Sequence, residues 1–318
     1  MEASLGTSRD ANVSLRVMDR PDWDEVAELI HLSTNFWYQT HGMNPVFNGD
    51  PHSTMLFCDV YESLDPGCCI VAVNDDSGKI VGSCFYHPRP THVSLGIMNV
   101  HPNYFGASIA SRLLQFIIDF AENLSLPVRL VSSALNLDSF SLYTRAGFMP
   151  RMAFQDMLLE VPESGLTFTV PDQQNVRAAT MDDVSSIVEL EYELNGISRE
   201  KDYKYFLSSS DGIWHGSVYE NDAGAIDGFM MSVRHPASNM IGPGASRNVT
   251  QATALILAEL DHHRGGTPVF LVPVTCTELV KTLYGWGARN CEIHFAQVLG
   301  EFQEPSGITL PTFMPETG

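Results

Sequence analysis

Apolar positions along the chain alternate between the period of a strand and the period of a helix, and the resulting series of predicted elements occurs twice. Strand, helix and hairpin are predicted first at 14–17, 21–30 and 69–85, and then again at 175–178, 181–194 and 216–233. Arg16 and Arg177 take matching places, 161 residues apart. The pattern therefore predicts two tandem copies of one α/β unit.

Later elements extend the repeat and set its boundaries. A helix and a strand at 108–123 and 128–133 correspond to a helix and a strand at 248–263 and 269–274. A stretch with Pro, Gly and Gln between the copies is typical of a linker. We predict a disordered lead-in at 1–13, a catalytic domain at 14–161, a linker at 162–174, a degenerate domain at 175–304 and a tail at 305–318.

A turn of small residues at 106–110 lies between the strand that ends at Val100 and the next apolar helix. Short side chains allow several backbone N–H groups to converge at the helix N-terminus, where the helix dipole favours an anion. Neither Gly-Lys-Ser/Thr nor G-x-G-x-x-G is present, so the turn is neither a Walker loop nor a dinucleotide fingerprint. The segment predicts a phosphate-binding turn.

A second motif follows one helix and one strand later and, with the turn, resembles the GNAT acyltransferase superfamily. These enzymes move an acyl group from acyl-CoA to an amine. The family pattern V-x-P-x-x-R-G-x-G-I-G/A is matched at Val100, Pro102, Gly106, Ile109 and Ala110. The pattern N-x-x-A-x-x-L-Y-x-x-x-G-F is matched at Asn136, Leu142, Tyr143, Gly147 and Phe148. Two positions depart from the family: Phe105 replaces Arg or Gln, and Ser108 replaces the second Gly. Ser139 takes the small-residue slot of the second pattern.

The resemblance implies an α/β (α+β) fold of two tandem GNAT-like domains, each a mixed, largely antiparallel central sheet flanked by helices. It implies acetyl-CoA as co-substrate, with main-chain groups of Met98, Asn99 and Val100 on the pantetheine and thioester. The other cofactor-binding residues that it implies are Phe105, Gly106, Ala107, Ser108, Ile109, Ala110, Ser111, Asn136, Ser139 and Tyr143.

Tyr143 is implied as the general acid that protonates the departing thiolate. The alternative is a tyrosine packed on a helix with its hydroxyl in water. Many family members carry a basic Glu on the fourth strand, but the strand at 92–100 has no carboxylate. His92 and His101 are the nearest titratable groups, although a histidine satisfied within a turn, or a water chain ending at backbone carbonyls, fits the sequence as well.

The predicted connection at 35–50 between the first two helices is the segment that closes the acceptor pocket in this family. Its aromatic and imidazole side chains are those of Trp37, Tyr38, His41 and Phe47. They could box an apolar or cationic acceptor, or pack one domain against the other. Asp59 and Glu62 share a helix face and could hold a cationic group, or be solvated acids.

The second copy lacks the features that predict chemistry in the first. Residues 241–246 stand where the first copy has its phosphate turn, and Pro243 removes a backbone donor there. Tyr284 is one residue out of phase with Tyr143, which rotates it by about 100° on a helix. We therefore expect the chemistry in the first copy.

The amino-acid composition limits the kinds of partner that this protein can bind. A net charge of −20 argues against nucleic acid, and agrees with a cationic acceptor or with a need for solubility alone. No apolar run is long enough for a membrane span, and the first residues lack the apolar core of a signal peptide. The six cysteines and eleven histidines form no metal-binding pattern, so we predict reduced thiols, no metal and a cytoplasmic location.

Three functions fit these observations. The first is an N-acetyltransferase acting on a small-molecule or peptide amine, and the second is a non-catalytic acyl-CoA-binding protein. The third is a scaffold in which both copies have lost the cofactor. A homodimer is left open.

Overall fold

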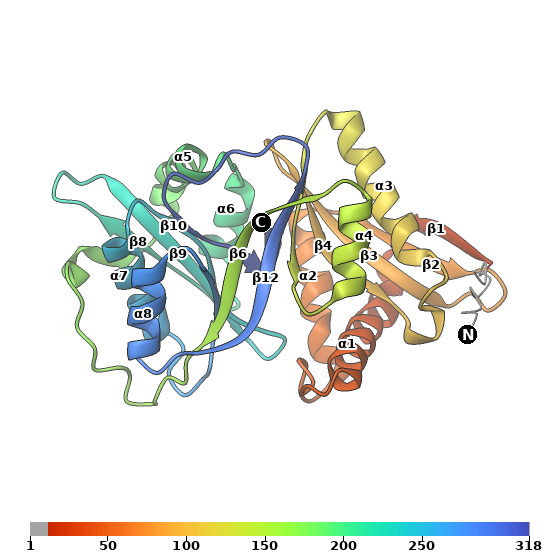
Figure 1. The fold of residues 1–318 in the computed structure, drawn as a ribbon, viewed down its shortest axis with the longest axis horizontal. Helices are drawn as coiled ribbons and strands as arrows, with labels where there is room; N and C mark the ends of the chain where they lie inside the picture. Colours follow the sequence, from red (N-terminus) through yellow and green to blue (C-terminus); the bar gives the residue numbers. More distant parts are fainter. Residues whose placement is uncertain (1–11, 318) are drawn as a thin grey trace, which may run out of the picture. The chain divides into compact units, whose positions relative to one another are not determined.

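The computed structural model describes residues 12–317, whose contacts divide the chain into two compact units. The first unit holds residues 12–87 and 95–125, and the second holds residues 88–94 and 126–317. Each unit contains a sheet with helices packed on it (Figure 1). Most of the predicted lead-in at 1–13 lies outside the described residues.

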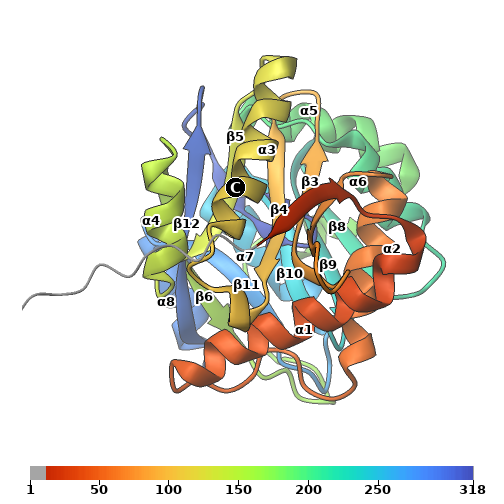
Figure 2. The same cartoon turned by 90° about the vertical axis from the view of Figure 1, so that its right-hand side faces the viewer.

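The first unit is built on the sheet order β1-β2-β3-β4, whose strands are labelled in Figure 1; β3 and β4 can also be found in Figure 2. Its elements are β1 (Val13–Val17), α1 (Trp23–Thr40), α2 (Met55–Leu64), β2 (Cys69–Asn74), β3 (Ile80–Pro88), β4 (Val93–Val100) and α3 (Ile109–Leu124). Phe85 on β3 packs against Tyr61 of α2, and its neighbour Tyr86 packs against Phe116 and Phe120 of α3. Because successive strand residues point to opposite faces, α2 and α3 cover the two faces of this sheet.

The second unit has the strand order β5-β12-β6-β11-β10-β9-β8-β7, with β13 paired to β10. Its first elements are β5 (Val128–Ser133), α4 (Leu137–Arg145), β6 (Met149–Leu158), β7 (Val176–Ala178), α5 (Val184–Asn195), α6 (Glu200–Ser208), β8 (Trp214–Glu220) and β9 (Ile226–His235). The rest are β10 (Ser238–Ser246), α7 (Val249–Asp261), β11 (Val269–Pro273), α8 (Thr277–Gly285), β12 (Arg289–Leu299), β13 (Ile308–Leu310), β14 (Thr312–Phe313) and β15 (Glu316–Thr317).

Alternation along β9 separates two cores in this unit. Phe229 and Met231 are buried with side chains of α5 and α6, whereas Met230 is buried with side chains of α7 and α8. The period of two in the sequence therefore places one pair of helices on each face of the sheet.

Two strands are exchanged between the sequence copies. β12, which closes the second copy, pairs antiparallel with β5 and with β6, and β6, which closes the first copy, pairs antiparallel with β11. Both strands therefore belong to one ladder of the second unit. The two compact units follow spatial contacts and divide the chain at other residues than the sequence repeat does. The domain limits predicted at 161 and 175 therefore stay a prediction.

The repeat itself is visible in matching contacts. Arg16 makes a bidentate pair with Asp22 at 2.6 and 2.8 Å, and Arg177 makes one with Asp183 at 2.8 and 2.8 Å. In both copies the aspartate closes a capping box one residue before α1 or α5 begins. The same local sequence thus builds the same strand-to-helix corner twice.

One predicted element differs. Helix α1 extends to Thr40, so residues 35–40 are helical and the connection to α2 is shorter than the predicted 35–50. Among the described residues, no helix combines the length and the apolar character that crossing a bilayer requires.

Candidate functional site

The segment that joins β4 to α3 has an unusual backbone. His101 caps a short 3-10 turn at Pro102–Tyr104, its ring Nδ1 accepting from the Asn103 amide at 3.2 Å. Gly106 has φ +80 and Ser108, the residue before α3, has φ +58. Two left-handed residues so close together turn the chain sharply into the helix.

This geometry leaves amides available at the start of α3. The first intrahelical bond runs from the Arg112 amide to the Ser108 carbonyl at 3.1 Å. The amides at 109–111 precede that bond and therefore have no partner within the helix. A side chain on Gly106 would meet no atom within 4 Å, so the turn is open on that side. Amides, helix dipole and open space together form a site that can bind an anion.

Two departures from the family pattern have visible consequences. Ser108 adopts the left-handed conformation that a glycine would take without strain, at a cost of about 1–2 kcal/mol. Phe105, which replaces Arg or Gln, is 51% exposed and packs edge-on against Phe36 at 6.2 Å between ring centroids. The turn thus has an apolar side chain beside it where the family usually has a polar one.

The predicted β4 residues have different surroundings. Asn99 is buried, and its side-chain amide donates to Ser33 at 2.7 Å and to Thr34 at 3.3 Å, both on α1. Met98 and Val100 are partly exposed. The Asn99 side chain therefore holds α1, and main-chain binding of pantetheine at 98–100 stays a prediction.

The second copy has no counterpart of the turn. Residues 241–246 are part of β10, so only Arg247 and Asn248 connect that strand to α7. The expectation of a degenerate loop at 241–246 is corrected to a continuous strand. Asn248 also caps α7, accepting from the Gln251 amide at 3.1 Å, which uses a donor that an anion would need.

Strand β13 pairs with the end of β10. On β10, Met240 and Ile241 pair with β11, whereas Gly244–Ser246 pair antiparallel with β13. A Cβ on Gly244 would overlap Met230, so this part of the strand is closely packed. The end of β10, which corresponds to the predicted cofactor-binding end of β4 in the first copy, is therefore paired with another strand of the chain.

Helix α4 carries the second sequence motif. Tyr143 is 7% exposed and its ring lies 5.9 Å from that of Phe148. Asn136 caps the helix by accepting from the Ser139 amide at 3.0 Å, so these two residues have a structural task in addition to the predicted cofactor contact. In α8, Tyr284 is 47% exposed and donates its hydroxyl to Gln155 at 2.9 Å. The two tyrosines therefore have different surroundings, as the difference in helical phase predicts.

The two candidate bases also differ. His92 is fully buried, and its ring nitrogens lie 3.0 Å from the hydroxyls of Thr91 and Ser94. His101 is partly exposed and lines a cleft of about 610 Å3 that also contains Glu25 and Glu28 of α1. Of the two, His101 is the one that a ligand in the first unit could reach, and the two glutamates were not singled out from the sequence.

The aromatic residues predicted for the acceptor pocket fall into two groups. Trp37 stacks on His41 at 4.2 Å and meets Tyr38 edge-on at 5.1 Å, at the end of α1. Phe47 is buried against His31 and Phe57 in the core of the first unit. Trp37, Tyr38 and His41 therefore form one group at the end of α1, whereas Phe47 contributes to the core of the first unit.

The two acids predicted on α2 have unlike surroundings. Asp59 is exposed, whereas Glu62 is partly buried and accepts from the Gly67 amide at 2.9 Å. Burial raises the pKa of Glu62. Only Asp59 is fully open to a ligand.

One side-chain cluster was not predicted. Asp156 of β6 and Glu292 and His294 of β12 bring ligand atoms within 4.8 Å of one another. Glu292 and His294 stand two apart on one strand, which is the one signal in the sequence, but nothing local points to Asp156 as their neighbour.

Comparison with known proteins agrees with this architecture. Residues 23–148 match the model of the acetyltransferase (GNAT) family. Over 88 residues, 27% of this chain, the sequence is 34% identical to the UPF0157 protein YqkA of Bacillus subtilis (strain 168), and the match spans 25% of that relative's length.

Two solved structures match nearly the whole chain. A Pyrococcus horikoshii protein provisionally assigned as an acetyltransferase has a TM-score of 0.74 at 14% identity, covering 99% of both chains. A tandem GNAT protein from the clavulanic acid biosynthesis pathway has a TM-score of 0.58 at 14% identity, covering 90% of this chain and 98% of that one.

The chain thus has a tandem GNAT fold. Residues 23–148 match the GNAT acetyltransferase family, and the fold class and family resemblance stated from the sequence are confirmed.

Proposed function

We propose that this protein is an acyl-CoA-dependent N-acyltransferase that uses the first copy to transfer acetyl from acetyl-CoA to a primary amine. The β4–α3 turn carries the proposal, because its open backbone and the amides at 109–111 suit the pyrophosphate of CoA. The protein has a net charge of −20, so a polyanionic cofactor needs such a local cradle.

The proposed reaction is direct attack in a ternary complex. The amine nitrogen attacks the thioester carbonyl, the carbon–sulfur bond breaks, and the CoA thiolate takes a proton from the Tyr143 hydroxyl. The acylated nitrogen then releases its remaining extra proton, which returns through water to the Tyr143 phenolate. A main-chain N–H at 98–100 stabilises the developing oxyanion. The proton of the attacking ammonium leaves through water, for which His101 is the accessible titratable group.

The acceptor is proposed to be a small-molecule or peptide amine. The cleft beside His101 is lined by Glu25 and Glu28, which lie one helical turn apart, and by Lys79, which pairs with Glu25 at 3.7 Å. Glu28 is therefore the carboxylate that we propose for a cationic acceptor. A cytoplasmic location belongs to the same proposal, and a homodimer is left open.

A second candidate is a non-catalytic acyl-CoA-binding protein. It is favoured by the absence of a carboxylate on β4, by the internal hydrogen bonds of His92 and by Phe105 at the head of the turn. In that case acetyl-CoA binds but no amine releases its thiol.

Two measurements separate these functions from a scaffold that binds no cofactor. Acetyl-CoA should raise the melting temperature, because a ligand that binds only the folded state stabilises it. Thiol release should then be followed with a panel of polyamines, amino sugars, lysine peptides and peptides with free N-termini. A thermal shift without thiol release from any amine selects the binding protein, and no thermal shift rejects both functions.

A further inference from the structure

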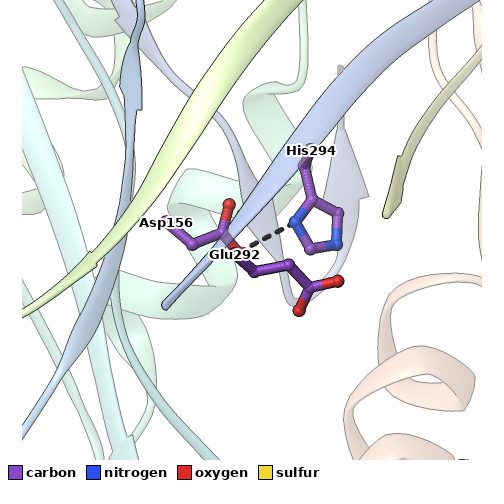
Figure 3. Close-up of side chains that lie close together, drawn as sticks. All are labelled: Asp156, Glu292 and His294. Atoms are coloured by element: carbon purple, nitrogen blue, oxygen red, sulfur yellow. Dashed lines mark ion pairs between the residues drawn. The ribbon is translucent and has the colours of Figure 1, made fainter. Parts of the chain in front are cut away.

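A side-chain cluster lies on the two strands that the sequence copies exchange. Asp156 of β6 stands directly opposite Glu292 of β12 in the register, and His294 follows two residues later on the same face (Figure 3). A register shift between Asn290 and Glu292 marks a bulge just before the cluster. Bulges of this kind are frequent beside functional sites.

The cluster places two carboxylates beside a single imidazole. Two carboxylates placed directly opposite on neighbouring strands repel each other. Asp156 is 3% exposed, and its Oδ1 has no hydrogen-bond partner.

The imidazole faces the same space as the carboxylates. His294 Nδ1 lies 2.8 Å from Asp156 Oδ2, yet this nitrogen makes no contact with the geometry of a hydrogen bond. Donor atoms that share one cation at 2.0–2.2 Å stand roughly 3 Å apart and point at the cation instead of at each other. Separations between 2.8 and 4.8 Å are within small side-chain rotations of that arrangement.

We propose that Asp156, Glu292 and His294 form a binding site for a divalent first-row transition metal ion. One imidazole nitrogen and two carboxylate oxygens suit Zn²⁺ better than the all-oxygen shell that Mg²⁺ and Ca²⁺ prefer. The Ser133 hydroxyl donates to Glu292 and orients it, as outer partners of metal ligands do.

The site joins the two sequence copies. Asp156 belongs to the last strand of the first copy, and Glu292 and His294 belong to the last strand of the second. A bound ion therefore links β6 to β12 and stabilises the pairing of these two exchanged strands. This effect does not depend on acyl transfer. Binding and stability report on the site without an acceptor amine.

The test uses the full chain, stripped of metal with a chelator and dialysed. Titration with Zn²⁺ by calorimetry should give one ion per chain and a higher melting temperature. Substitution with Co²⁺ should give visible absorption bands of mixed nitrogen and oxygen ligation. A wild-type chain that binds no Zn²⁺ overturns the proposal.

Single substitutions locate the ion. Asp156→Asn, Glu292→Gln and His294→Gln should each weaken Zn²⁺ binding tenfold or more, since even outer-shell changes cost about 10–100-fold. The matched control is His87→Gln, because His87 also contacts a buried carboxylate, that of Asp65, at 2.8 Å. This control should bind Zn²⁺ within twofold of wild type.

The stability of each variant without metal is also measured, so that poor folding of a variant can be told apart from loss of the metal site. Asp156→Asn removes one of two facing carboxylates, so without metal it should be at least as stable as wild type and should lose only the rise caused by Zn²⁺. Strong destabilisation of metal-free Asp156→Asn would show that the His294 pair alone balances the charge, and would overturn the proposal. Equal Zn²⁺ affinity in wild type and the three variants would do so as well.

Discussion

The segments that enter α3 and α7 occupy matching places in the two copies but differ in length, backbone and capping. Residues 101–108 form a turn with two left-handed positions, whereas Arg247 and Asn248 alone join β10 to α7. The guanidinium of Arg247 is held by Glu193 at 2.6 and 2.8 Å and by Asp227 at 2.9 Å. An anion would therefore meet a capped helix and two carboxylates in the second copy.

The two copies share one local structure and differ at the position of the predicted cofactor site. The corner before α1 and α5 is present in both copies, including the bidentate arginine–aspartate pair. In the second copy β13 pairs with the end of β10, which corresponds to the predicted cofactor-binding end of β4. We expect one acetyl-CoA per chain.

The largest effect is expected from the tyrosines of α4 and α8. Tyr143→Phe should lower the rate of thiol release by roughly 10²–10⁴, the range for a positioned general acid, with acetyl-CoA affinity retained. Tyr284→Phe should leave the rate unchanged, since that hydroxyl is exposed and bonded to Gln155. Single-turnover assays would measure both. A Tyr143→Phe variant that is folded and fully active removes the acid role.

A smaller effect is expected at Gly106. Gly106→Val should weaken acetyl-CoA binding on the order of tenfold, about 1.4 kcal/mol, because a branched side chain disfavours the left-handed turn that presents the amides. Gly224→Val is the matched control, since Gly224 also has φ +80 and no atom within 4 Å of an added Cβ. Both variants should lose similar stability, but only Gly106→Val should lose affinity in a calorimetric titration. Equal affinity in both would place the cofactor elsewhere.

Stability at the ends of α3 gives a finer comparison. Ser108 and Ser125 both have left-handed backbones, with φ +58 and +57. Ser108→Gly and Ser125→Gly should each stabilise the fold by roughly 0.5–1 kcal/mol in urea unfolding, because glycine removes strain but adds freedom to the unfolded chain. Only Ser108→Gly is expected to alter acetyl-CoA affinity. Destabilisation by both changes would contradict the backbone argument.

The smallest effect concerns the repeated corner. Asp22→Asn and Asp183→Asn should each cost no more than about 1 kcal/mol, since both arginine partners are half exposed. The hydrogen bond from Arg16 lowers the pKa of Asp22, and Arg177 does the same for Asp183. The stability that each contributes is therefore full above the unfolded value of about 3.9 and is lost as the pH falls below it. Denaturant titrations at pH 7 and pH 3 should show a smaller cost at pH 3 for both variants alike.

The sequence by itself determined the tandem repeat, most element positions and the turn before α3. These follow from local causes: a period of two or 3.6 places apolar residues on one face, and a proline or small residue sets a turn. β5 was predicted at its observed bounds, and the repeated arginines were matched before their partners were known. These local features can be predicted without knowing which distant segments of the chain lie nearby.

Only the tertiary structure decided which distant segments meet. Three features join segments that are far apart in the chain. They are the exchange of β6 and β12, the pairing of β13 with β10, and the cluster of Asp156 with Glu292 and His294. A strand pattern shows which face is buried but not which strand is its neighbour, because any apolar strand offers the same backbone groups for pairing. The partner is selected by the packing of the whole sheet, which no single stretch of this sequence contains.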